Sequence, residues 1–133
     1  IGFKNFIRVP IASTSEGVHE VLSCLDVYTH GRSDGEVCSS AIIEAMYHGL
    51  PIVTHKSGIN NGHLYQINGC GFLGDNIEQY ASNMYSLFSN KQLYDESSQK
   101  TKQAYSEKFN FLEIEKRILH VLENVGKSNK GNK

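Results

Sequence analysis

No apolar run in the sequence is long enough to cross a membrane. Runs such as residues 41–43 fall far short of the roughly 20 apolar residues that a spanning helix needs, and Glu44 ends this one. Of the 133 residues, 39% are hydrophobic, which is enough for one core, and the length fits one domain better than two. The sequence therefore predicts a single folded domain without a transmembrane segment.

Cysteine is scarce in this chain. Its three cysteines, Cys24, Cys38 and Cys70, give an odd count and form no CxxC or CxxxC pair. This pattern argues against a disulfide framework and against a zinc ribbon, so a reducing compartment fits best. We expect a cytoplasmic location, and peripheral membrane association through the full-length protein stays open.

Charge of one sign is not in strong excess. Lys and Arg number 13 against 14 Asp and Glu, which gives a formal net charge of -1. The balance changes along the chain, because residues 1–99 carry five basic and ten acidic side chains and residues 100–133 carry eight and four. Residues 126–133, rich in Lys, Gly and Asn, predict a disordered basic tail. We expect no nucleic-acid partner.

Short β-branched runs alternate with helical patterns, which is typical of βα units and a parallel sheet. The sequence predicts an α/β fold with one domain over residues 1–125. The expected strands are residues 6–11, 24–29, 52–54 and 71–73; the expected helices begin near residue 13, span residues 39–48 and 77–88, and run from about residue 91 to 122 with a break near residue 110. We expect these helices to cover the sheet and their apolar stripes to form the core.

The loops that follow the expected strands are candidates for a binding site. Ligands of open parallel sheets lie beyond the carboxyl ends of the strands. Here those ends lead into residues 9–15, 30–36 and 55–63, and the last two loops concentrate glycines, hydrogen-bonding side chains and two basic groups. Such loops on a rigid scaffold are typical of functional sites and also of ordinary turns.

Glu44 lies in the middle of an apolar helical pattern. A carboxylate there either reaches the edge of its helix or meets hydrogen-bond donors, and a ligand can supply them. Glu36 stands eight residues earlier, which is roughly 12 Å along a helix axis. Between them the backbone amides of Val37, Cys38, Ser39 and Ser40 open the expected helix, and a helix N-terminus attracts phosphate. An anion site between two carboxylates suits a nucleotide sugar, because that molecule has hydroxyl groups at both ends and phosphates in the middle.

Several motifs resemble the C-terminal donor-binding domain of family 4 glycosyltransferases, which have the GT-B fold. The similarity is carried by residues 25–30 (LDVYTH), by Gly35-Glu36, by the Glu36-x7-Glu44 spacing with Ala45-Met46 after it, and by residues 49–54 (GLPIVT). It extends more loosely to about Val125. The resemblance implies a Rossmann-like parallel sheet flanked by helices, as part of a GT-B C-terminal domain.

The family's activity is the transfer of a hexose from a nucleoside diphosphate sugar to a saccharide or lipid-linked acceptor, as in glycan or polysaccharide biosynthesis. The resemblance implies that the configuration at the sugar is retained, that no metal or other cofactor is needed, and that the donor is UDP- or GDP-linked. It implies that Glu36 is the catalytic residue near the donor sugar and that Glu44 binds the ribose. The amides of Val37, Cys38, Ser39 and Ser40 would meet the diphosphate, and the loop containing Val9 would flank the nucleobase.

The chain departs from the family's pattern in three respects. Val37-Cys38-Ser39 replace the usual Gly-Phe-Gly, and the basic residues that grip the diphosphate in the family have no counterpart. Arg32 is a candidate to contact phosphate in their place. The first residues contain neither an initiator methionine nor a signal peptide, which indicates a start inside a longer protein. We therefore expect the N-terminal acceptor domain to be missing and the isolated fragment to be inactive.

Other interpretations of the same residues remain open. The chain is alternatively a non-catalytic module that binds nucleotide or sugar, or a flavodoxin-like domain that works through protein contacts. Histidines 30, 55 and 63 lack the fixed spacing of a metal site, so we expect them to be hydrogen-bonding loop residues. We expect Cys38 to be a small packing residue rather than a nucleophile.

Overall fold

The computed structural model of the protein describes residues 12 and 14–128. The expected strand over residues 6–11, including Val9, lies outside the described residues, as do residues 129–133 of the expected tail.

A parallel sheet of three strands forms the centre of the fold. Its strands are β1 (Tyr28–His30), β3 (Ile52–His55) and β5 (Gly71–Gly74), in the order β1-β3-β5. All pairs are parallel, so the predicted α/β class is confirmed. The strand expected over residues 24–29 begins only at Tyr28, because Cys24 still caps the preceding helix and its backbone N–H donates to Val21.

Six helices lie among the described residues. They are α1 (Ser15–Ser23), α2 (Ser40–Tyr47), α3 (His63–Gln66), α4 (Ile77–Ser89), α5 (Lys91–Lys108) and α6 (Phe111–Ser128). All but α3 were expected, and α3 is too short for hydrophobic periodicity to reveal. The end of α2 follows its sequence signals, since Gly49 adopts a φ of 69° just after the helix and Pro51 follows.

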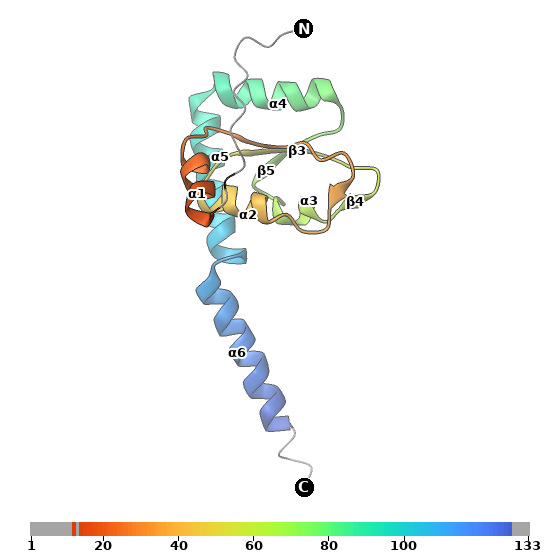
Figure 1. The fold of residues 1–133 in the computed structure, drawn as a ribbon. Helices are drawn as coiled ribbons and strands as arrows, with labels where there is room; N and C mark the ends of the chain where they lie inside the picture. The colour runs from red at the N-terminus through yellow and green to blue at the C-terminus, as the bar shows by residue number, and fades with distance from the viewer. Residues whose placement is uncertain (1–11, 13, 129–133) are drawn as a thin grey trace.

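The helices cover both faces of this sheet. Figure 1 shows α4 on one face and α2 and α3 on the other, with α5 running beside both layers. The core lies between α2 and the sheet, where Ile42, Met46 and Ile52 are completely buried. This packing fixes α2, and with it Glu44, against the rest of the domain.

A second, two-stranded sheet joins two segments that we expected to be loops throughout. Strand β2 (Gly35–Glu36) pairs in parallel with β4 (Asn60–Asn61), which places Glu36 opposite Asn61. The approach is close, because a Cβ atom at Gly62 would lie 2.0 Å from the Val37 carbonyl oxygen. The two segments therefore form one structural unit at the end of the main sheet.

Helix α6 contradicts the expectation that every helix covers the sheet. It extends away from the body of the fold (Figure 1), and its apolar side chains are exposed. Periodicity identifies which face of a helix is apolar but not what packs against it. These exposed residues are Phe111, Leu112, Ile114, Ile118, Leu119, Val121, Leu122 and Val125.

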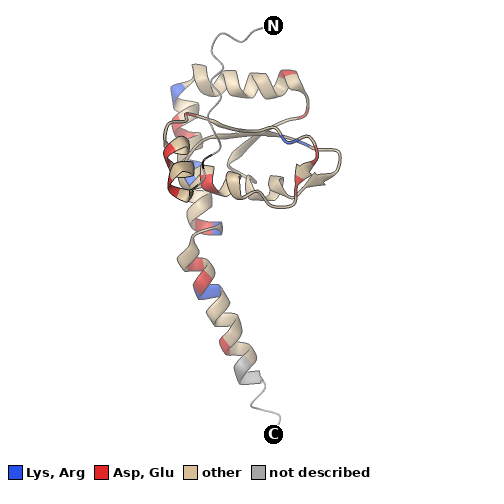
Figure 2. Cartoon of the chain, viewed as in Figure 1, with Lys and Arg blue, Asp and Glu red and all other residues tan. Residues whose placement is uncertain are grey.

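The same helix continues through Ser128, so the first three residues of the expected tail are helical. Figure 2 shows both acidic and basic residues along α6. No helix in the described part of the chain is long and apolar enough to cross a membrane.

Candidate functional site

Glu36, at the end of β2, is held by Arg32. The Arg32 Nη1 atom donates to Glu36 Oε1 at 2.8 Å, while Nε and Nη2 donate to the Asp34 carboxylate at 2.8 and 3.2 Å. The Ser39 hydroxyl, which has the largest effect, and Arg32 both hold the pKa of Glu36 below its ordinary value. Arg32, the expected phosphate contact, is thus engaged with two carboxylates, and a phosphate would have to compete with them.

His30, the last residue of β1, faces the other oxygen of Glu36. His30 Nε2 lies 3.7 Å from Glu36 Oε2, and the His30 side chain is only 8% exposed. Burial lowers the pKa of His30, and the nearby Glu36 carboxylate opposes this effect. Neither of the two facing atoms has a hydrogen-bond partner among the described residues.

The segment between Glu36 and α2 is anchored by Gln66. The Ser39 N–H donates to Gln66 Oε1 at 2.7 Å, and Gln66 Nε2 donates to the Ser39 carbonyl at 3.0 Å and to Cys38 Sγ at 3.5 Å. The expected phosphate-binding amides do not all open the helix, because α2 begins at Ser40 with Ser39 as its N-cap. The Ser39 amide is already bonded within the protein, whereas Val37, Cys38 and Ser40 are exposed.

His63 joins the two segments that carry β2 and β4. It is completely buried, with Nε2 3.1 Å from the His55 carbonyl oxygen and Nδ1 3.4 Å from the Glu36 carbonyl oxygen. The rings of His30 and His63 are 5.2 Å apart. The side chains of His55 and His63 therefore contact backbone carbonyls, whereas that of His30 faces Glu36. The described residues contain no group of three or more His, Cys, Asp or Glu side chains placed to hold a metal ion.

Glu44 lines a cavity of about 280 Å³ between α1, β1 and α2, which we call the Glu44 cavity. Its other walls are mostly apolar: Ala12, Val18, Val21, Leu22, Tyr28 and Ala41. Burial raises the pKa of Tyr28, and the charges of Glu36 and Glu44 raise it further. Both carboxylates therefore act on one phenol, although only Glu44 belongs to the helix and the expected 12 Å helical spacing does not apply.

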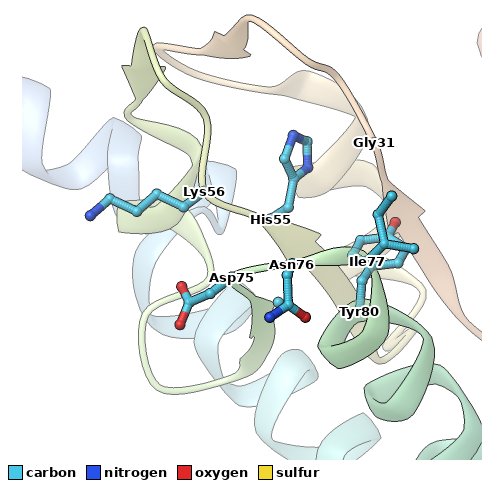
Figure 3. Close-up of a pocket in the computed structure, with 8 residues that line it drawn as sticks. Gly31, His55, Lys56, Asp75, Asn76, Ile77 and Tyr80 are labelled. Atoms are coloured by element: carbon cyan, nitrogen blue, oxygen red, sulfur yellow. The ribbon is translucent and has the colours of Figure 1, made fainter.

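A second hollow, the strand-end cavity, has a volume of about 310 Å³ and lies where the three strands of the main sheet end. Gly31 follows β1, His55 ends β3 and Gly74 ends β5. Figure 3 shows Lys56 and Asp75 at one end of it and Ile77 and Tyr80 at the other. It lies beyond the carboxyl ends of the strands, where we expected a ligand site.

Sequence reasoning missed Gln66 and Tyr28. Gln66 is 5% exposed and acts on a residue 27 positions earlier, and no local pattern marks such a contact. Tyr28 lies in the segment of residues 24–29, which was assigned only to a strand. The sequence offers one weak signal for Gln66, which is a polar residue directly before Ile67. The burial of Ile67 is visible in the structure.

Comparisons with known proteins give one structural similarity. No protein-family model matches the chain, and no curated protein matches it. The chain is similar to the solved structure of HepE from Anabaena in complex with UDP-glucose, with a TM-score of 0.68 and 20% sequence identity. The match covers 81% of this chain and 30% of the HepE chain. The chain thus has the α/β fold of the matching part of HepE.

Proposed function

We propose that this chain is the nucleotide-sugar-binding part of a retaining, family 4 glycosyltransferase. The observation that carries the proposal is the placement of Glu36 in the strand before α2 and of Glu44 within α2, where Glu44 lines the cavity between α1, β1 and α2. The fold supports the proposal, because HepE shares this fold and was solved in complex with UDP-glucose.

Each residue has a distinct role in this proposal. Glu44, from the wall of its cavity, accepts hydrogen bonds from the ribose hydroxyls. The exposed start of α2 at Ser40, with Val37 and Cys38, meets the diphosphate, whose charge the helix dipole stabilises without a metal ion. Glu36 contacts the donor sugar as the leaving diphosphate departs. In this arrangement Arg32 moves from the Glu36 carboxylate to the phosphates.

The transfer itself needs more protein than this chain. The chain spans about 30% of the length of HepE, and we propose that an acceptor domain in the same protein closes over the donor. The acceptor is a saccharide or a lipid-linked saccharide. With three free cysteines in the described residues, we place the reaction in the cytoplasm.

Binding of the donor is tested by NMR titration of the chain with UDP-glucose, UDP, GDP and a GDP-linked hexose. We expect shifts at Glu36, Ser40 and Glu44. In Glu44→Gln the affinity should fall roughly 10–100-fold, because a charged acceptor of two hydroxyl groups is lost. Glu115→Gln, on exposed α6, is the matched control and should bind like the wild type. A folded chain that shows no shift at millimolar ligand would refute the proposal.

One observation favours a non-catalytic nucleotide-binding module instead. The Arg32–Glu36 ion pair covers the carboxylate oxygen that the sugar would use. An assay of the full-length protein distinguishes the two alternatives. An enzyme transfers or slowly hydrolyses the donor sugar, whereas a non-catalytic module only binds it.

A further inference from the structure

His30 Nε2 and Glu36 Oε2 share an unusual situation. Both atoms are buried, and neither has a hydrogen-bond partner among the described residues. Buried polar atoms without a partner are rare in folded proteins because they cost free energy. The two atoms face each other at 3.7 Å, which exceeds a hydrogen bond of ordinary length by roughly 0.5–1.0 Å. A small rotation of either side chain would join them.

The two oxygens of Glu36 are in different environments. Oε1 accepts a hydrogen bond from Arg32, whose side chain is 54% exposed. Oε2 is buried, faces His30 Nε2 and has no hydrogen-bond partner among the described residues, and the Ser39 hydroxyl also acts on the same carboxylate. Arg32 keeps two bonds to Asp34 if it leaves Glu36. The exposed oxygen is therefore released by breaking one hydrogen bond, while the buried oxygen stays where it is.

We propose that His30 is the positioning residue for Glu36, donating its Nε2–H to Oε2 and holding the carboxylate while Oε1 exchanges Arg32 for a hydroxyl group of the bound sugar. The second half of this inference rests on the proposed function, whereas the His30–Glu36 contact does not. His30 acts on the donor only through Glu36.

The surroundings of His30 keep it a neutral donor near neutral pH. Burial lowers its pKa most, and His63, His55 and Arg32 lower it further, whereas Glu36 alone raises it. Tyr28 completes the set of titratable neighbours, with its ring 6.5 Å from that of His30. A neutral N–H orients the carboxylate and leaves its negative charge available to a sugar hydroxyl. Protonated His30 would neutralise that charge, so donor binding should weaken as pH falls below the ordinary histidine range.

Two substitutions separate hydrogen bonding from space filling. His30→Phe keeps an aromatic ring and removes the N–H, and His30→Gln restores an N–H donor. The control is His120→Phe on exposed α6. In the ligand-free chain, the carboxyl pKa of Glu36 is followed by carbon-13 NMR. We expect it to rise in His30→Phe and to keep its wild-type value in His30→Gln and in His120→Phe.

Donor binding gives the second readout. With UDP-glucose as the probe, His30→Phe should weaken binding about tenfold at pH 7.5, and His30→Gln should recover most of the loss. His30→Phe and His30→Gln should both lose the weakening of binding that the wild type shows as the pH falls below the ordinary histidine range, because neither side chain titrates there, whereas His120→Phe should keep it.

The outcomes are distinguishable. If the Glu36 pKa is unchanged in His30→Phe, or if His30→Gln shows the same Glu36 pKa and the same loss of affinity at pH 7.5 as His30→Phe, the inference is wrong. If the Glu36 pKa rises in His30→Phe but no nucleotide sugar binds to the chain, the His30–Glu36 contact stands and the proposed function fails. Should His30→Phe not fold, nitrogen-15 NMR of the wild-type imidazole decides, because a proton on Nδ1 instead of Nε2 would overturn the inference.

Discussion

Replacement of Gln66 by methionine should loosen the segment that leads from Glu36 into α2. Gln66 is 5% exposed and Ser39 is 3% exposed, so water cannot easily replace the bonds between them. Methionine has nearly the volume and flexibility of glutamine but neither the donor nor the acceptor. Gln66→Met therefore removes the polar contacts of this side chain with little change in packing.

The expected loss follows from the partners left behind. The Ser39 N–H loses its acceptor at 2.7 Å and becomes a buried, unpaired donor. The Ser39 carbonyl loses the bond from Gln66 but still accepts from the Ile43 amide at 3.3 Å. One unsatisfied donor and one weakened acceptor together cost about 2–3 kcal/mol. For a chain of this size the melting temperature should fall by roughly 6–12 °C.

Urea unfolding followed by circular dichroism measures the loss of stability, and hydrogen exchange of the Ser39 amide measures its local origin. That amide should exchange much faster in Gln66→Met. Gln103→Met is the control, because Gln103 is exposed on α5 and, among the described residues, its side chain bonds to Glu107 on the same helix. It should stay within about 0.5 kcal/mol of the wild type. A loss below about 0.5 kcal/mol in Gln66→Met, with unchanged exchange at Ser39, would refute the reasoning.

Two further pairs of variants test the fold. Gly62→Ala should lower the free energy of unfolding by about 2 kcal/mol or more, because the new Cβ would collide with the Val37 carbonyl. Gly58→Ala is the control and should be nearly neutral in thermal unfolding, because no atom of a described residue other than its chain neighbours lies within 4 Å of its Cβ. Ile118→Ser should change the free energy of unfolding by less than about 1 kcal/mol, since Ile118 is 54% exposed, whereas Ile42→Ser at a fully buried site should cost about 3–5 kcal/mol. A large loss in Ile118→Ser would mean that α6 packs against the body of the fold in solution.

The elements with local signals were predictable from the sequence. Helix α2 has an N-cap serine at its start and a glycine with positive φ after its end, and both act within one turn of the helix. The segment from α2 to β3 was predicted within a residue or two for that reason. Glu44 could be identified as a candidate because a carboxylate in an apolar helix needs a partner, and Glu36 because of its spacing from Glu44 and the motif around both residues.

Features that depend on distant contacts were not predictable. The β2–β4 pairing joins residues 25 positions apart over only two residues on each side, which is too short for an alternating pattern. The anchor at Gln66 and the partners of His30 are likewise set by how the loops fold over one another. The apolar face of α6 was predicted correctly, but its burial was not, because the sequence of a helix does not contain its packing partner.

The two-residue pairing of β2 with β4 has a consequence for how the site moves. Each strand of the pair is bonded to the other rather than to the three-stranded sheet, so Glu36 and Asn61 should open and close as one cooperative unit. Opening that unit breaks few bonds and leaves the buried β3 strand intact. The amides of the unit should then exchange with a single, low opening free energy, and those of β3 only on global unfolding. A ligand that closes over Glu36 would raise the protection of the β4 segment as well.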